Sequence, residues 1–127
     1  MTGVFLVDDS PLIRARLRAM LDAMPGVETV GEADGADAAI AAILGRRPQV
    51  VLLDMSLAQG TGFDVLRAVH ETAPEVAFYM LSNFATPPYR RLAERLGARG
   101  YFDKSSDFER VREVFERKTP CPSPLAC

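Results

Sequence analysis

The stretch that decides the fold is GVFLVDDSP at residues 3–11, where an apolar strand pattern gives way to two aspartates and a helix start. The run GVFLV carries no charge and has the length of a buried strand. Ser10 then offers a helix N-cap and Pro11 a first helical position. The stretch therefore predicts a strand and a helix joined by a short turn that carries Asp8 and Asp9.

The rest of the chain repeats this alternation, which predicts an α/β fold with five βα units and a parallel sheet. The expected strands lie at residues 3–7, 27–33, 50–53, 76–81 and 100–102. The first expected helix starts at Pro11 and is ended by Pro25 and Gly26, and the second runs from a cap at Asp34 to Gly45. The third starts at Gly62 or Phe63. The fourth follows the bend at Pro87 and Pro88 and ends at Gly97, and the fifth covers 108–115. In the fourth helix, Tyr89 and Leu92 are among the residues expected to face inward.

The composition is that of one ordinary globular domain. The chain has 127 residues, of which 48% are apolar and 25% charged, enough to bury a core without disulfides. The formal charge of −2 provides no overall basic field for nucleic acid or an anionic membrane. The first residues lack the pattern of a secretory signal, and no apolar run approaches the roughly 18 residues of a membrane span. We therefore expect a cytoplasmic protein.

The last nine residues, TPCPSPLAC at 119–127, differ from the rest of the chain. Their three prolines argue against a helix or a central strand, and they contain both cysteines, Cys121 and Cys127. We expect a folded domain over residues 1–118 followed by a disordered tail with reduced thiols. Metal capture or redox pairing by the two cysteines is the alternative.

Polar side chains follow four of the predicted strands: Asp8, Asp9, Asp54, Ser82 and Lys104. Open α/β sheets bind their ligands outside the carboxyl ends of the strands, so these side chains should meet at one edge. Crowded carboxylates raise one another's pKa, and a bound cation relieves the repulsion. Oxygen ligands in a small site favour Mg²⁺, with Mn²⁺ as a substitute.

This set of residues also predicts phosphoryl chemistry. With a metal held by Asp9 and Asp54, the remaining oxygen of Asp54 can attack a phosphoryl donor and form an aspartyl-phosphate. Lys104 would balance the added charge, and the Ser82 hydroxyl would donate to a phosphoryl oxygen. No general base is required. Any one of these residues alone would be an ordinary cap or turn residue.

Together with Tyr101, three residues before Lys104, the spaced set DD, D, S and K resembles a response-regulator receiver domain of two-component signalling, in its single-domain form. The likeness runs from about residue 3 to 117. It implies a three-layer, doubly wound (βα)5 flavodoxin-like fold with strand order 2-1-3-4-5, which is typical of receivers. By position, Asp54 matches the phosphoacceptor.

The resemblance implies further roles. Asp8 and Asp9 match the metal-binding acidic pair, and the main-chain carbonyl of Met55 would be another ligand. Lys104 and Ser82 match the lysine and hydroxyl of the site, with Ser82 and Tyr101 forming the switch. The implied partner-binding face comprises Arg90, Arg91, Arg95, Tyr101 and the last helix. Ser56 and Phe84 occupy positions that tune dephosphorylation, and the bulk of Phe84 predicts slow self-hydrolysis. Ala58 replaces a common proline, which predicts a looser loop.

The leading hypothesis is therefore a phosphoacceptor switch that catalyses only its own phosphorylation and dephosphorylation. A sensor histidine kinase or phosphotransfer protein would be the donor, and the output a contact with a downstream protein, as a monomer or a phosphorylation-linked dimer. One alternative is an interaction module that works without phosphorylation, and another is the N-terminal receiver fragment of a longer DNA-binding regulator. A phosphatase of the haloacid dehalogenase type is disfavoured, because Ser56 stands where that type needs a second aspartate.

Overall fold

A computed structural model describes residues 2–83, 87–104 and 110–116 of the chain. It contains five strands and five helices: β1 (Thr2–Val7), α1 (Pro11–Asp22), β2 (Val27–Ala33), α2 (Ala36–Arg46), β3 (Val50–Asp54), α3 (Gly62–Thr72), β4 (Ala77–Ser82), α4 (Pro87–Arg95), β5 (Gly100–Asp103) and α5 (Val111–Glu116). The strands form one sheet in the order β2-β1-β3-β4-β5, with parallel pairing throughout. The predicted class and strand order are confirmed. The predicted tail, 119–127, lies outside the described residues.

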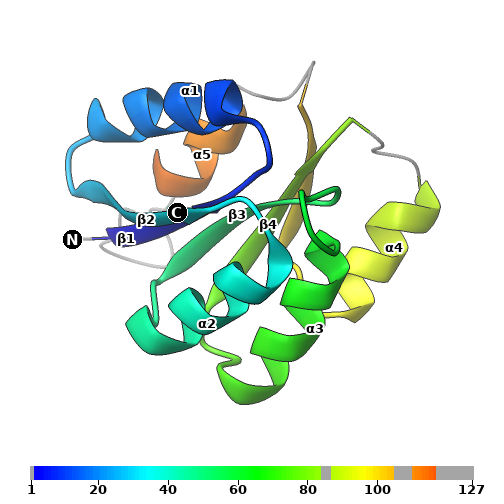
Figure 1. Cartoon of the computed structure of the whole chain (residues 1–127). Helices are drawn as coiled ribbons and strands as arrows, with labels where there is room; N and C mark the ends of the chain where they lie inside the picture. Colours follow the sequence, from blue (N-terminus) through cyan, green and yellow to red (C-terminus); the bar gives the residue numbers. More distant parts are fainter. Residues whose placement is uncertain (1, 84–86, 105–109, 117–127) are drawn as a thin grey trace, which may run out of the picture.

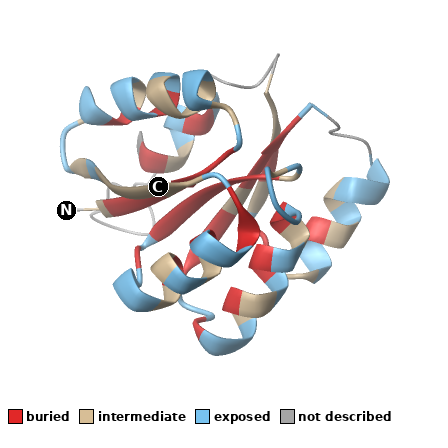
Figure 2. Cartoon of the chain, in the orientation of Figure 1, coloured by how far each residue is buried: buried red, intermediate tan, exposed pale blue. Residues whose placement is uncertain are grey.

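The sheet is the middle of three layers. Helices α1 and α5 cover one face, and α2, α3 and α4 cover the other (Figure 1). Two apolar clusters fill the spaces between the layers, one built around Phe5 and Phe78 and the other around Leu6 and Leu52. Figure 2 shows buried residues concentrated in the strands and exposed ones on the outer sides of the helices. No helix in the described part of the chain is both long and apolar enough to span a bilayer.

The strand register brings the predicted site residues to one edge of the sheet. Val7 at the end of β1 lies opposite Leu53 in β3, and Ser82 at the end of β4 lies opposite Asp103 at the end of β5. Because all five strands are parallel, the residues that follow these positions emerge at the same edge. β3 is buried along its whole length, as its unbroken apolar run predicts for a central strand.

The start of α1 follows the prediction, but α1 ends at Asp22, before the predicted stop at Pro25 and Gly26, and α2 departs from its prediction at both ends. The Ser10 hydroxyl caps α1 by accepting the Ile13 N–H at 3.3 Å. Asp34 does not cap α2; the N-cap is Gly35, which has no side chain to offer. The helix also continues through Gly45 and ends beyond it. Its last turn closes at Arg47, whose left-handed backbone (φ 49°) directs its N–H to the Ile43 carbonyl.

Helix α4 also departs from its prediction at the start. Pro87 and Pro88 form its first turn, where the missing proline N–H groups would have no helical partner in any case. Tyr89 is 40% exposed, although we expected it to face the core. Its ring stacks on Phe63 of α3 with centroids 6.4 Å apart, so it joins two helices at the surface while Ala93 makes the buried contact.

Among the described glycines, Gly62 at the start of α3 leaves the least room for a side chain. A Cβ atom at Gly62 would lie 2.2 Å from the Asp54 carbonyl oxygen and 3.1 Å from Met80 Cε. Gly62→Ala should therefore lower the free energy of unfolding by about 3 kcal/mol, the scale of overpacking strain. Urea denaturation measures this change.

The matched control is Gly45→Ala on the exposed surface of α2, where a new Cβ meets nothing within 4 Å. Replacing a glycine inside a helix by alanine should stabilise the protein by about 0.5–1 kcal/mol. Equal effects at the two glycines would contradict the packing described for the start of α3.

Candidate functional site

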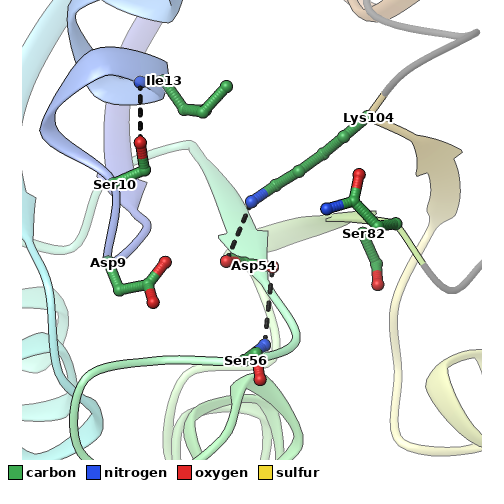
Figure 3. A pocket seen from close by; sticks show the side chains of 8 residues that line it. Asp9, Ser10, Ile13, Asp54, Ser56, Ser82 and Lys104 are labelled. Atoms are coloured by element: carbon green, nitrogen blue, oxygen red, sulfur yellow. Dashed lines mark hydrogen bonds and ion pairs between the residues drawn. The ribbon is translucent and has the colours of Figure 1, made fainter.

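Asp54, the last residue of β3, lies at the centre of the predicted site. Only 5% of it is exposed. Lys104 Nζ lies 2.9 Å from its Oδ2 oxygen, and the Ser56 N–H donates to its Oδ1 oxygen at 3.4 Å. Figure 3 shows the Lys104 side chain extending from beyond β5 to reach this carboxylate. Asp54 and Lys104, which we expected at the same edge of the sheet, thus form a direct ion pair.

Lys104 also holds Asp8, the residue that follows β1. The distance from its Nζ to Asp8 Oδ2 is 2.7 Å, and the other Asp8 oxygen accepts the Ser10 N–H at 2.8 Å. Asp8 is 1% exposed, so its carboxylate is fixed by a cation on one oxygen and by the turn into α1 on the other. One ammonium group therefore bridges the loops that follow β1 and β3.

Asp9 completes a cluster of three carboxylates. Ligand oxygens from Asp8, Asp9 and Asp54 all lie within 4.8 Å of one another. Asp9 is exposed, and in Figure 3 its carboxylate lies on the α1 side of the same hollow as Asp54. This oxygen-only donor set fits Mg²⁺, which takes one or two carboxylates and keeps several waters.

The hollow above the cluster has a volume of about 410 Å³. Its lining residues are Asp9, Ser10, Ile13, Asp54, Ser56, Ser82, Asn83 and Lys104. Sequence reasoning predicted five of these and missed Ser10, Ile13 and Asn83 as members of the site. Ser10 and Asn83 directly follow Asp9 and Ser82, and that position was the available signal, because a residue next to a strand end at this edge approaches the ligand. Ile13, in the first turn of α1, carried no such signal.

Burial and the neighbouring charges together shift the pKa values of Asp54 and Lys104. Burial, reinforced by the charge of Asp8, raises the pKa of Asp54 from 3.8 to about 6, although the bond to Lys104 opposes the shift. Burial would lower the pKa of Lys104, but its bonds to Asp8 and Asp54 outweigh it and raise the pKa instead. At pH 7 a pKa of about 6 leaves roughly nine-tenths of Asp54 ionised, so the carboxylate is available as a nucleophile.

Met55 begins the loop after Asp54, residues 55–61. Its carbonyl oxygen, the predicted metal ligand, accepts the Gly62 N–H at 2.7 Å, which leaves one lone pair for another partner. Ala58 is the residue at which we expected a looser loop than proline would give. The Ala58 N–H donates to the Asp34 carbonyl at 2.9 Å, a bond that proline could not make.

Ser82 and Tyr101 lie beside the site on β4 and β5. Ser82 is 1% and Tyr101 6% exposed. Burial raises the pKa of the Tyr101 phenol, while a side-chain hydrogen bond with Ser82 opposes that shift. The Tyr101 hydroxyl also donates to Met55 Sδ at 3.8 Å. The two predicted switch residues are therefore in contact with each other, and Tyr101 also contacts the loop after Asp54.

Within the predicted partner face, Arg90 connects α4 to Tyr101. The Arg90 guanidinium lies 5.5 Å from the centre of the Tyr101 ring and donates to the Tyr101 carbonyl at 3.3 Å. Arg91 and Arg95 are exposed on α4. Of the two predicted tuning positions, Ser56 lines the hollow, and Phe84 lies outside the described residues.

Comparisons with known proteins agree with this architecture. Residues 4–116 match the response regulator receiver domain family. The chain is 34% identical over 104 residues to the DNA-binding transcriptional activator DevR/DosR of Mycobacterium tuberculosis, covering 82% of this chain and 48% of that protein. It is 33% identical over 117 residues to a protein-glutamate methylesterase/protein-glutamine glutaminase of Carboxydothermus hydrogenoformans, covering 91% of this chain and 34% of that protein.

A solved structure of a LuxR-family two-component response regulator from Aurantimonas superposes with a TM-score of 0.85 at 26% identity, covering 92% of this chain and 84% of that one. The fold and the match over residues 4–116 define a receiver domain of the kind found in signalling proteins. The chain belongs to the receiver domain family of two-component response regulators. It spans about half the length of the first curated relatives it matches.

The raised pKa of Asp54 predicts a pH-dependent stability. Because the folded state holds this proton more tightly than the unfolded state, the stabilisation from protonated Asp54 is full below pH 3.8 and is lost as the pH rises through about 6. In metal-free buffer at pH 7.5, Asp54→Asn should be more stable than the wild type by about 1–3 kcal/mol.

Urea denaturation at pH 7.5 and pH 4.5 tests this prediction, and the difference between the two proteins should narrow at the lower pH. The asparagine retains the shape of the side chain without its charge, so packing is held constant. If the two proteins differed in the free energy of unfolding by the same amount at both pH values, the pKa of Asp54 would not be raised in the folded state.

Proposed function

We propose that Asp54 accepts a phosphoryl group from a sensor histidine kinase or a phosphotransfer protein in a Mg²⁺-dependent reaction. Receiver domains as a family interact with such donors. The observation that carries the proposal is a buried but ionised carboxylate, held by Lys104 within a cluster of three aspartates at the floor of an open hollow. We propose that the protein catalyses only its own phosphorylation and dephosphorylation.

The step requires one nucleophile and one leaving group. A carboxylate oxygen of Asp54 forms a bond to phosphorus while the bond from phosphorus to the donor nitrogen breaks, and the imidazole of the donor leaves with the electron pair and takes up a proton. Lys104, already 2.9 Å from Asp54, offsets the charge that the phosphoryl group brings. Ser82, at the end of the adjacent strand, would donate its hydroxyl hydrogen to a phosphoryl oxygen.

The proposed ligands of Mg²⁺ are Asp8, Asp9, Asp54 and the carbonyl of Met55. Their chemistry fits the ion, because all are oxygen donors and the three carboxylates lie close together. When bound, Mg²⁺ neutralises charge on the phosphoryl oxygens and on the carboxylates. Each Asp8 oxygen has one partner, Lys104 or the Ser10 N–H, which leaves a lone pair on each oxygen for the ion.

The proposed output passes from Ser82 through Tyr101 to α4. Phosphorylation would draw Ser82 toward the new phosphoryl group and change its hydrogen bond with Tyr101. Arg90 contacts both the ring and the carbonyl of Tyr101, so a shift of the tyrosine would alter the surface formed by Arg90, Arg91 and Arg95. We propose that a downstream protein reads this surface in the cytoplasm, and that the switch acts as a monomer or a phosphorylation-linked dimer.

A second candidate function is the receiver part of a longer DNA-binding regulator. It is favoured by the length of the relatives, of which this chain spans about half, and by the name of one as a DNA-binding transcriptional activator. The chemistry proposed at Asp54 would be the same in that protein. Only the output would differ, because the altered surface would then act on a neighbouring domain. A module that works without phosphorylation is the remaining alternative.

Incubation with Mg²⁺ and acetyl phosphate should add one phosphoryl group to the wild type, detected by intact mass. Asp54→Asn should gain none because it lacks the attacking oxygen, and Asp9→Asn should need a Mg²⁺ concentration about tenfold higher because a charged ligand is lost. Removal of Mg²⁺ with a chelator should abolish the reaction in the wild type.

The matched control is Asp22→Asn, which makes the same chemical change at an exposed position at the end of α1. It should be phosphorylated at the wild-type rate. Phosphorylation of Asp54→Asn at that rate, or a wild type that gains no mass, would reject the proposed function.

A further inference from the structure

Helix α2 begins without a cap of its own. Its N-cap residue is Gly35, which makes no side-chain hydrogen bond. The first N–H groups of a helix have no partner within the helix and need one from elsewhere. Here the partners come from the loop at residues 55–61, which follows Asp54 and belongs to a different βα unit.

Gln59 provides two of these partners. Its main-chain carbonyl accepts the Ala36 N–H at 2.7 Å, and its side-chain Oε1 accepts the Asp37 N–H at 3.0 Å. The Ala58 N–H adds a third bond, to the Asp34 carbonyl at 2.9 Å. Three hydrogen bonds in two consecutive loop residues therefore fix the loop to the chain that enters α2.

The same stretch is tied on its other side to the loop after β1. We call residues 33–37 the strap. Its first residue, Ala33, accepts the Asp8 N–H at 3.1 Å, and its last, Asp37, donates to Gln59. The strap therefore connects the backbone that carries Asp8 to the loop that begins at Met55, which are the two loops that supply the proposed metal ligands.

We infer that Gln59 is a positioning residue for the Mg²⁺ site: by holding the loop against the strap, it sets the separation between the Met55 carbonyl and the aspartates after β1. This inference rests on the proposed function. Gln59 does not reach the reacting atoms, since it is absent from the lining of the hollow. Its effect would pass through the backbone, as partners outside the ligand shell commonly orient metal ligands.

Gln59→Ala removes the Oε1 acceptor and keeps the main-chain carbonyl. The Mg²⁺ dissociation constant, measured by an NMR titration at constant ionic strength, should rise about three- to tenfold. The Mg²⁺ concentration that half-saturates phosphorylation by acetyl phosphate should rise by the same factor. The rate at saturating Mg²⁺ should stay near that of the wild type, because Asp54, Lys104 and Ser82 are unchanged.

The matched control is Gln49→Ala. Gln49 Oε1 accepts the Gly3 N–H at 2.7 Å, an equivalent bond at the start of β1, at the opposite edge of the sheet from the aspartates. Loss of this bond should lower the urea midpoint about as much as Gln59→Ala does, but it should leave the Mg²⁺ dissociation constant unchanged. Equal Mg²⁺ affinities in the two variants would overturn the inference.

A second variant separates positioning from helix capping. Gly35→Ser gives α2 a cap of its own, and the extended backbone at Gly35 (φ −135°) accepts a side chain, which would lie 3.4 Å from Gln59 Cβ. Combined with Gln59→Ala, it should restore the urea midpoint and leave Mg²⁺ binding weak. If the double variant recovered Mg²⁺ affinity, Gln59 would act only as a cap of α2 and not as a positioning residue. A wild type that binds no Mg²⁺ would reject the proposed function itself.

Discussion

One lysine between two buried carboxylates is the interaction on which the rest of the structure depends. Lys104 lies 2.7 Å from Asp8 and 2.9 Å from Asp54, and all three groups come from different strand ends. The pair of carboxylates outnumbers the single ammonium, and Asp9 adds further negative charge at the same place. Burial makes this imbalance costly, as the raised pKa of Asp54 shows. This excess of negative charge supports the proposed binding of a cation, which would in turn offset the charge of a phosphoryl group.

The parallel sheet makes this arrangement possible. Because the five strands run in one direction, the residues at their carboxyl ends lie at one edge, and described residues at the ends of β1, β3, β4 and β5 line a common hollow. The loops are not independent of one another. Gln59 holds the loop after β3 against the start of α2, while the Tyr101 hydroxyl contacts Met55 Sδ. Bonds between loops, as much as the strands themselves, connect the site to the surface helices.

Much of the fold could be predicted because its signals are local. The apolar run at β3, the cap at Ser10 and the order of the units are read directly from neighbouring residues. The errors fall where a distant segment supplies what the local sequence lacks. Asp34 looked like the cap of α2, but Gln59, more than twenty residues later, provides the acceptors. Tyr89 looked like a core residue because of its spacing, but stacking on Phe63 holds it at the surface.

The sequence by itself determined which chemical groups the protein has and at which strand ends they stand, because periodicity and turn residues are short-range properties of the chain. It therefore identified Asp8, Asp9, Asp54, Ser82 and Lys104 as one candidate set. Only the tertiary structure decided how these groups share their bonds: that one ammonium serves two carboxylates, and that both Asp8 oxygens are engaged. The same holds for Ala58, whose N–H ties its loop to Asp34. Those contacts depend on distances between segments far apart in the chain, which only packing fixes.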